Sequence, residues 1–301
     1  MTNKTAMITM AGRPNVGKST LTNALTGEKV AIVTPKPQTT RNRIFGVFSH
    51  GDTQFILLDT PGFHKARTRL GDYMVGVVKE SVADVDAVAL IVEPVDNIGT
   101  QEEMLIGHIE KAGVPAVLLI NKIDTVRVEE VLPVIERYSR RYKFDAIMPI
   151  SAKTGDGIPQ LIEIFGKYAT EGPQLFPDGM TTDQPEKQVI AEIIREKLLI
   201  CLEREIPHGA AVEITKFSER PDAGTAEHGI IDIEATIYCE KMSHKGIIIG
   251  KNGEMLKKIG QLAREDIEKF MGAKVYLQTW VKVKENWRDN QTLLKNFGYT
   301  N

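Results

Sequence analysis

The sequence predicts an α/β domain with a mainly parallel sheet, followed by a smaller α+β domain. In the first half, short apolar segments alternate with amphipathic ones, which is typical of buried parallel strands with helices on both faces. In the second half, the order changes to helix, two strands, two helices and strand, which is typical of an open sheet with helices packed against it. At 301 residues, the chain is long enough for two domains, each with its own core.

Composition and charge narrow the classes of function. Hydrophobic residues make up 42% and charged residues 26%, as in an ordinary globular protein. The net charge of −2 excludes nucleic-acid binding through overall charge, so such binding requires a local basic patch. No apolar segment is long enough to span a membrane, and the first residues lack the apolar core of a signal peptide. Because Cys201 and Cys239 also fit free thiols in a reducing compartment, we expect a cytoplasmic protein.

Ten segments of the first half are expected to be strands and helices. The expected strands are 7–11, 54–58, 87–92, 116–120 and 146–149. The expected helices lie near 18–26, 67–82, 101–112, 128–141 and 158–169. Ligands of parallel sheets bind at the carboxyl ends of the strands. Four polar motifs follow strands of this set, so we expect them to lie at one edge of the sheet.

The first motif lies between the first strand and the first helix. It reads Gly12-Arg13-Pro14-Asn15-Val16-Gly17-Lys18-Ser19, which has the spacing of a phosphate-binding P-loop. The glycines let backbone N–H groups turn toward a polyphosphate at the positive end of the following helix. In that role Lys18 reaches the outer phosphates, and Ser19 offers a hydroxyl to Mg²⁺. A plain glycine turn is the alternative, and the motif alone does not say which nucleotide binds.

The second motif, Asp59-Thr60-Pro61-Gly62, follows the strand 54–58. A carboxylate at a strand end can hold Mg²⁺ through a water molecule, and the N–H of Gly62 is placed to meet a γ-phosphate. Asp, Pro and Gly also form ordinary turns. The position one strand after a P-loop favours the nucleotide role.

The third motif, Asn121-Lys122-Ile123-Asp124, distinguishes between bases. Guanine presents two adjacent donors, N1–H and N2–H₂, and the carboxylate of Asp124 can accept from both. Adenine would leave that carboxylate unpaired, which is a steep penalty. The aliphatic stem of Lys122 suits the plane of the base, and Asn121 can tie neighbouring loops together. In the fourth motif, Ser151-Ala152-Lys153, a backbone N–H could donate to guanine O6; a polar loop is the alternative reading.

These four motifs, in this order, resemble the GTPases of the translation-factor-like class over residues 5–170. The resemblance implies phosphate binding by Gly12–Ser19, Mg²⁺ ligation by Ser19, a second switch at 59–62, and base recognition by Asn121, Lys122 and Asp124. It places the first switch within residues 36–41, where Thr40 is the favoured Mg²⁺ ligand and Thr39 the alternative.

Two residues qualify the resemblance. Phe63 stands where many small GTPases carry a water-orienting Gln, so we expect slow intrinsic hydrolysis. Two roles are compatible with Asn15: it could ligate K⁺ beside the phosphates, or it could only shape the loop.

A boundary between domains is expected after the last helix of the first half. The segment from Glu171 to Gly179 contains two Pro and two Gly residues. We therefore expect a first domain over 1–172, a linker over 173–185 and a second domain over 186–301. In the second domain, helices are expected at 186–203, 243–249 and 254–271, and strands at 211–218, 230–239 and 273–284.

The motif of the second domain is Gly250-Lys251-Asn252-Gly253, between its last two helices. Two glycines let a sugar-phosphate backbone come close, and Lys251 can neutralise phosphate. Residues 241–258 contain five Lys, including Lys245 and Lys257, and one Glu, so the motif lies in a local basic excess. A helix C-cap followed by a turn is the alternative.

The second domain resembles a type 2 KH domain, and the joined domains resemble the Era family of bacterial ribosome-assembly GTPases over essentially the whole chain. That resemblance implies binding of the 3′ end of 16S rRNA in late assembly of the small ribosomal subunit. It also implies a monomer with peripheral contact to the inner membrane, although we find no basic amphipathic helix that predicts such contact. Two alternatives are a GTPase whose C-terminal domain binds protein, and a P-loop metabolic kinase, for which residues 121–124 would have no use.

Overall fold

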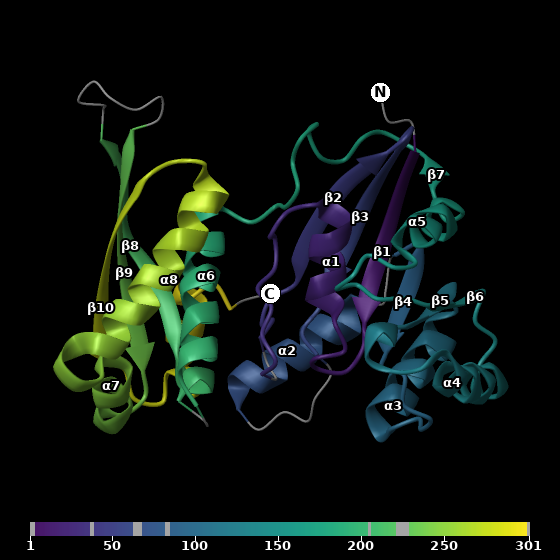
Figure 1. Cartoon of the computed structure of the whole chain (residues 1–301), viewed down its shortest axis with the longest axis horizontal. Helices are drawn as coiled ribbons and strands as arrows, with labels where there is room; N and C mark the ends of the chain where they lie inside the picture. Colours follow the sequence, from purple (N-terminus) through teal and green to yellow (C-terminus); the bar gives the residue numbers. More distant parts are fainter. Residues whose placement is uncertain are drawn as a thin grey trace. The chain divides into compact units, whose positions relative to one another are not determined.

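The computed structural model describes residues 4–36, 39–62, 68–81, 85–203, 206–220 and 229–299. The chain divides between Asp183 and Gln184 into two compact units, named here the N-terminal and C-terminal domains (Figure 1). In the described part of the chain, no helix is both long and apolar enough to cross a membrane.

A mainly parallel sheet forms the centre of the N-terminal domain, as predicted (Figure 1). Its strand order is β2-β3-β1-β4-β5-β6, and β7 pairs with β1. The β2–β3 and β1–β7 pairs are antiparallel, and the other pairs are parallel. The strands are β1 Lys4–Ala11, β2 Ile44–His50, β3 Thr53–Asp59, β4 Ala87–Val92, β5 Ala116–Ile120, β6 Ala146–Pro149 and β7 Thr170–Glu171.

Helices cover both faces of this sheet, because successive residues of its central strands are buried on opposite sides. In β5, Val117 and Leu119 pack in the core formed with α1 and α5, whereas Leu118 and Ile120 pack in the core formed with α3 and α4. The helices are α1 Lys18–Thr26, α2 Arg69–Glu80, α3 Thr100–Ala112, α4 Val128–Arg141 and α5 Ile158–Gly166. Each expected helix of this half is present.

The N-terminal domain differs from expectation in three places: strands β2 and β7, which no predicted range covers, and part of the expected linker. Strand β2 lies in a segment for which no strand was predicted, and it forms a hairpin with β3 through a turn at Gly51, whose φ is +60°. Part of the expected linker packs on this domain. Gln54 accepts hydrogen bonds from the N–H groups of Leu175 and Phe176, at 2.9 and 3.0 Å, and donates to the carbonyl of Phe176.

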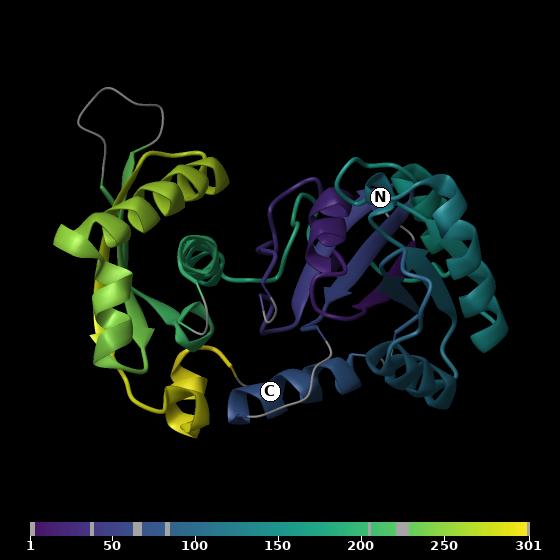
Figure 2. The same cartoon turned by 60° about the horizontal axis from the view of Figure 1, so that its bottom comes forward.

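The C-terminal domain has the expected order of helix, two strands, two helices and strand. Its elements are α6 Glu186–Cys201, β8 Ala211–Arg220, β9 Ile230–Cys239, α7 Met242–Ile249, α8 Glu254–Met271 and β10 Val275–Val283. The strand order is β10-β9-β8, with β9 antiparallel to β8 and parallel to β10. Strand β10 therefore forms an edge of the sheet, beside α8 (Figure 2).

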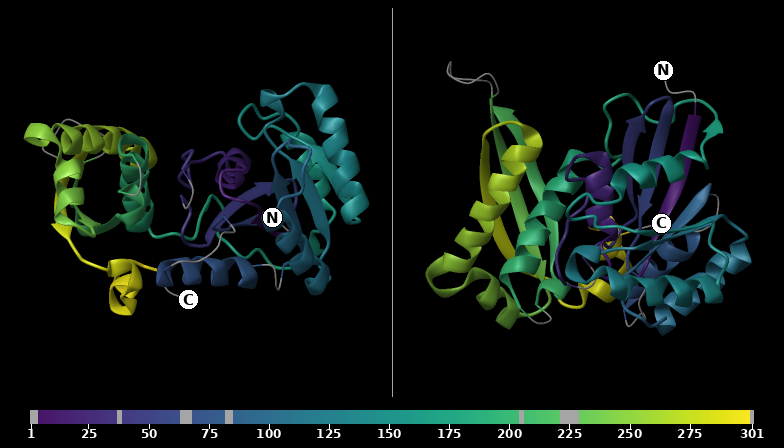
Figure 3. Two further views of the ribbon diagram at one scale, coloured as in Figure 1. Left: turned by 90° about the horizontal axis from the view of Figure 1, so that it is seen from below. Right: turned by 45° about the vertical axis from the view of Figure 1, so that its right-hand side comes forward.

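The period-two pattern of β9 builds the core of this domain. Every second residue of the strand is buried in the core formed with the helices: Ile231, Ile233, Ala235, Ile237 and Cys239. Beyond β10 the chain forms one further short helix, α9 Gln291–Asn296, drawn in yellow in Figure 3, which the sequence did not predict. Trp287 anchors this segment, because its side chain is fully buried and its indole N–H donates to the carbonyl of Gly209 at 2.9 Å.

Candidate functional site

A cavity of about 330 Å³ lies at the carboxyl ends of the central strands of the N-terminal domain. It brings the P-loop together with the segment 32–40, which lies 20 residues away in sequence, and with residues from the ends of β3 and β5. The described lining residues are Pro14, Asn15, Gly17, Lys18, Ser19, Thr20, Ile32, Val33, Thr34, Pro35, Thr39, Thr40, Gly62 and Lys122. Three of the four sequence motifs before Asp183 thus contribute to the lining of one cavity, and the fourth, Ser151-Ala152-Lys153, does not.

Asn121 ties three of these motifs into one structure. Its side-chain amide donates to the carbonyl of Val16 at 2.8 Å, and its Oδ1 accepts from the N–H of Ala152 at 2.9 Å. This close approach requires glycine at position 17, where φ is +104° and a Cβ would lie 2.2 Å from Asn121 Nδ2. The polar pairs between loops hold the P-loop in place relative to the loop 151–153.

Lys18 is a buried cation held over the P-loop. Its Nζ donates to the carbonyls of Gly12 and Arg13, at 3.0 and 2.7 Å. Burial lowers the pKa of Lys18 to about 8, although the nearby carboxylate of Asp59 acts in the opposite direction. A positive charge with so little solvent around it interacts strongly with any anion that enters the cavity.

Ser19, Thr40 and Asp59 form a cluster of oxygen atoms beside Lys18. Ser19 Oγ donates to Asp59 Oδ2 at 2.6 Å and lies 2.9 Å from Thr40 Oγ1. Thr39 points elsewhere, since its hydroxyl lies 2.7 Å from Thr34 Oγ1 and donates to the carbonyl of Lys36 at 2.7 Å. The geometry thus separates the two threonines that sequence could not.

The cluster fits a divalent cation. Asp59 is fully buried, and its Oδ1 has no hydrogen-bond partner among the described residues. Burial raises the pKa of Asp59 to about 6, against the effects of Lys18 and of the hydrogen bond from Ser19. An oxygen-rich site with an unpartnered buried carboxylate oxygen matches the ligand preference of Mg²⁺, whose charge would offset the desolvation of the carboxylate.

The second switch motif begins directly against the P-loop. Thr60 Oγ1 donates to the carbonyl of Met10 at 2.9 Å, and a Cβ on Gly62 would lie 2.6 Å from Pro14 Cα. Only glycine allows this approach. Pro61 links the two residues. Phe63, on which the expectation of slow hydrolysis depends, lies outside the described residues, as do two first-switch residues, Pro37 and Gln38.

Asp124 and Ser151 form a pair that is not part of the cavity lining. Ser151 Oγ donates to Asp124 Oδ1 at 2.7 Å, which fixes the plane of the carboxylate. Asp124 lies with Ile123 in a short 3₁₀ turn, Ile123–Thr125, and both Asp124 and Lys153 are exposed. Lys122 lines the cavity, and its Nζ lies 2.6 Å from Glu93 Oε1. The third and fourth motifs therefore meet, as their positions after β5 and β6 predicted.

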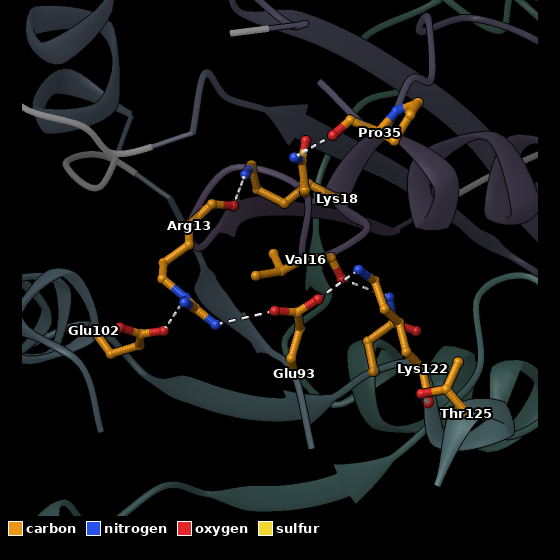
Figure 4. A network of polar contacts seen from close by, with 10 residues as sticks. Arg13, Val16, Lys18, Pro35, Glu93, Glu102, Lys122 and Thr125 are labelled. Carbon is orange, nitrogen blue, oxygen red and sulfur yellow. Dashed lines mark hydrogen bonds and ion pairs between the residues drawn. The ribbon is translucent and has the colours of Figure 1, made fainter. Parts of the chain in front are cut away.

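Arg13 departs from the role that its place in the P-loop suggests. It lies outside the cavity lining, and its guanidinium contacts the carboxylates of Glu93 and Glu102 (Figure 4). Arg13 contributes to the site through its carbonyl, which accepts from Lys18. Sequence reasoning missed Glu93 and Glu102. The available signal was the position of Glu93, which directly follows β4 at the same edge of the sheet as the four motifs.

A groove of about 460 Å³ lies in the C-terminal domain between α8 and the edge strand β10. Its lining residues are Gly253, Leu256, Lys257, Gly260, Gln261, Arg264, Leu277 and Thr279. Two of them, Gly253 and Lys257, were predicted RNA-binding residues. The missed polar residues Gln261 and Arg264 follow Lys257 at helical spacing, which was the signal that could have found them.

The other predicted RNA-binding residues are not part of the groove lining and precede Gly253 in the chain. Lys251–Gly253 is a single 3₁₀ turn between α7 and α8, in which Asn252 has φ of +53°. Gly250 precedes this turn, Lys251 is exposed, and Lys245 is half-buried on α7. Of the neighbouring isoleucines, Ile248 belongs to the core, whereas Ile247 is 50% exposed and offers an apolar surface next to the turn.

Comparison with known proteins matches each domain to a known family. Residues 7–122 match the family model described as 50S ribosome-binding GTPase, and residues 205–288 match the KH domain model. The chain is 49% identical to GTPase Era of Ruminiclostridium cellulolyticum over 299 residues, which cover 99% of this chain and 98% of that protein. It is also 49% identical to GTPase Era of Clostridium kluyveri over 296 residues, covering 98% and 99% of the two chains.

Two solved structures match the chain almost completely. A crystal structure of Era in complex with MgGDPNP and nucleotides 1506–1542 of 16S ribosomal RNA has a TM-score of 0.93 at 36% identity, covering 99% of each chain. A variant of Aquifex aeolicus Era bound to GDP and AlF₄⁻ has the same TM-score and identity, covering 99% of this chain and 100% of that one. With relatives 49% identical over nearly its whole length, the chain belongs to the Era family of GTPases.

Proposed function

We propose that this protein is a GTP-controlled switch that binds the 3′ end of 16S rRNA and acts in late assembly of the small ribosomal subunit. The observation that carries this proposal is the convergence of Thr40 with Ser19 and Asp59. It connects a segment outside the P-loop to the cation site, so occupancy of the phosphate site can change the arrangement of residues 33–45. Hydrolysis of GTP then serves as the off-step.

At the phosphate end, residues Gly12–Ser19 surround the phosphates with backbone N–H groups. Lys18 exchanges its two carbonyl partners for the outer phosphate oxygens. Ser19 and Thr40 ligate Mg²⁺, and Asp59 holds it through a water molecule. The cation supplies charge compensation for the β- and γ-phosphates. Gly62, packed against Pro14, presents its N–H to the γ-phosphate.

At the base end, Asp124 accepts from guanine N1–H and N2–H₂. The hydroxyl of Ser151 orients that carboxylate, and the stem of Lys122 covers the plane of the base. Asn121 holds the loop 151–153 beside the base. An adenine would leave Asp124 unpaired, so the same geometry disfavours ATP and with it a metabolic kinase.

In the C-terminal domain, the turn Gly250–Gly253 and the groove along α8 receive single-stranded RNA. The support is the combination of an exposed edge strand, an apolar lining from Leu256 and Leu277, and cations at Lys257 and Arg264. Bases of single-stranded RNA can enter such a groove while the backbone lies against the turn. The Era structure with nucleotides 1506–1542 of 16S rRNA supports the identity of the RNA.

Replacement of Gly253 by Asp tests RNA binding against protein binding. Gly253 lines the groove, and a Cβ there would meet no atom within 4 Å, so the new carboxylate fits and repels phosphate. We expect the affinity for the 3′-terminal segment of 16S rRNA to fall about tenfold or more. The measurement is fluorescence anisotropy of the labelled RNA.

Gly272→Asp is the matched control. Gly272 lies at the other end of α8, has φ of +62° against +79° for Gly253, and is equally open. This variant adds the same charge and the same backbone strain, and it should keep the RNA affinity. An unchanged affinity of the Gly253→Asp protein would instead favour a C-terminal domain that binds protein.

Location and oligomeric state belong to the same proposal. Cys201 and Cys239 are both free thiols, which supports the cytoplasm. Peripheral contact with the inner membrane and a monomeric state rest on the family resemblance. Flotation with liposomes and light scattering of the purified protein test these two points.

A further inference from the structure

Glu93 uses both oxygens of its carboxylate to connect two loops of the nucleotide site. Oε1 lies 2.6 Å from Lys122 Nζ, and Oε2 lies 3.1 Å from Arg13 Nη2. Figure 4 shows Glu93 between these two side chains. Arg13 also pairs through Nε with Glu102, which is almost fully buried. The four side chains form a row of alternating charge: Lys122, Glu93, Arg13 and Glu102.

Both cations of this row are connected to the proposed nucleotide site. Lys122 belongs to the guanine-binding motif, and Arg13 belongs to the P-loop. Lys122 has left-handed backbone geometry, with φ of +67°, and its carbonyl accepts from Thr125 N and Oγ1, at 3.0 and 2.7 Å. Its backbone is therefore held locally, and Glu93 determines the direction of the side chain. On the other side, the carbonyl of Arg13 accepts from Lys18 Nζ at 2.7 Å.

We propose that Glu93 is a positioning residue that joins the guanine-binding loop to the P-loop. Glu93 does not line the cavity, so it acts through Lys122 and Arg13. The inference rests on the proposed roles of Lys122 and of the P-loop. It goes beyond them by assigning to one carboxylate the relative placement of the base side and the phosphate side of the cavity.

The surroundings of Glu93 explain why these pairs are more than ordinary surface contacts. The side chains of Arg13, Lys122 and Glu93 are each about one-third exposed, at 35%, 36% and 31%. Glu102, only 3% exposed, holds Arg13 from the opposite side. Space for Glu102 is provided by Gly99, where a Cβ would lie 2.6 Å from Glu102 Oε2. A charge that is fixed from both sides loses little side-chain entropy when it binds Glu93.

Glu93→Gln tests the proposal, because it keeps the shape of the side chain but removes its charge and one of its two acceptor oxygens. We expect the affinity for GDP to fall about five- to tenfold, mainly through faster dissociation. The matched control is Glu103→Gln on the same helix as Glu102. It breaks the pair of Glu103 with Arg141, at 2.7 Å and with 42% and 30% of the side chains exposed, away from the cavity.

The Glu103→Gln protein should bind GDP like the unmodified protein. A double-mutant cycle adds a measurement that a purely structural role would not change. Lys122→Met keeps the aliphatic stem without the cation, so in that background Glu93→Gln should have a smaller effect than in the unmodified protein. An affinity of Glu93→Gln within twofold of the unmodified protein, or effects that simply multiply, would overturn the proposal.

The proposed guanine specificity has a separate readout, which is the preference of the unmodified protein for GDP over ADP. Absence of that preference would overturn the proposed base recognition. A clear preference together with an unchanged affinity of Glu93→Gln would overturn only the positioning role of Glu93.

Discussion

Among single residues, Asp59 is the one that makes the nucleotide site suited to a cation. Its carboxylate is buried beside Lys18 and Ser19, and one of its oxygens has no hydrogen-bond partner in the described part of the chain. A buried carboxylate of this kind is stabilised by a cation. The position of Asp59 at the end of β3 indicated this role from sequence, because the carboxyl ends of parallel strands share one edge.

Thr40→Ala separates the two threonines of the first switch. Thr40 Oγ1 lies at the cation cluster, so its loss should weaken Mg²⁺-dependent binding of a non-hydrolysable GTP analogue about tenfold while GDP affinity changes little. Thr39→Ala removes the adjacent hydroxyl, which contacts Thr34 and Lys36 instead, and is the matched control. Isothermal titration with the analogue and with GDP measures both variants. A selective loss in Thr39→Ala would reverse the assignment.

Asn15 carries a prediction about monovalent ions. Its amide N–H donates to the carbonyl of Pro35 at 2.6 Å, and φ is +66°, both of which fit a loop-forming role. Asn15 also lines the cavity, where a side-chain oxygen can ligate K⁺. If it does, GTP hydrolysis should be several-fold faster in KCl than in NaCl at equal ionic strength. Equal rates would leave only the loop-forming role.

What sequence could not supply at this scale was pairing between distant side chains. The motifs contain part of the cavity lining, such as Lys18, Gly62 and Lys122, whereas the lining residues 32–35 belong to no motif. Glu93 and Glu102 belong to no motif, and their function depends on Arg13 turning away from the phosphates. Only the folded chain brings together residues 13, 93, 102 and 122.

At the level of elements, regular periodicity predicted nearly all helices and strands. The bounds of α1, β4, β5, α4, β6 and α8 agree with the expected ranges to the residue. The exceptions have physical reasons. Strand β2 contains Gly46 and ends in polar residues, so its alternation is weak. Helix α9 has only six residues, and burial of Trp287 rather than its own periodicity holds it.

The groove between α8 and β10 is another feature that local sequence patterns predict only in part. The turn Gly250–Gly253 was visible in the sequence. Predicting the groove also requires the order of the strands in the sheet, which determines the strand that lies beside α8. The order β10-β9-β8 places β10 at an edge of the sheet. Leu277 and Thr279, which complete the groove, alternate in β10 like any half-buried residues, so no local signal distinguished them.

Tertiary contacts show that some residues of the predicted linker pack on the N-terminal domain. The content of Gly and Pro predicted an irregular stretch from Glu171 to Gly179. Glu171 ends β7, residues 172–179 are irregular, and the chain divides between Asp183 and Gln184. Leu175 and Phe176 nevertheless belong with Gln54 of β3. Glycine and proline predict where regular structure ends, but they do not predict which domain the irregular segment packs against.

For the whole molecule, the net charge of −2 does not reveal that one domain contains a nucleotide site and the other a basic turn. The phosphate cavity belongs to the N-terminal domain, and the groove with Lys257 and Arg264 belongs to the C-terminal domain. If the molecule is a switch, the state of the first site must change the free energy of binding at the second. Such coupling requires contacts that differ between the GTP and GDP states.

Crosslinking of the 3′-terminal segment of 16S rRNA to the purified protein tests this coupling most directly. The protein is loaded with Mg²⁺ and either GDP or a non-hydrolysable GTP analogue, and the RNA captured is measured over a range of RNA concentrations. We expect the apparent affinity to differ at least fivefold between the two nucleotides, and the difference to disappear in Thr40→Ala. Equal capture of RNA with both nucleotides would contradict the switch.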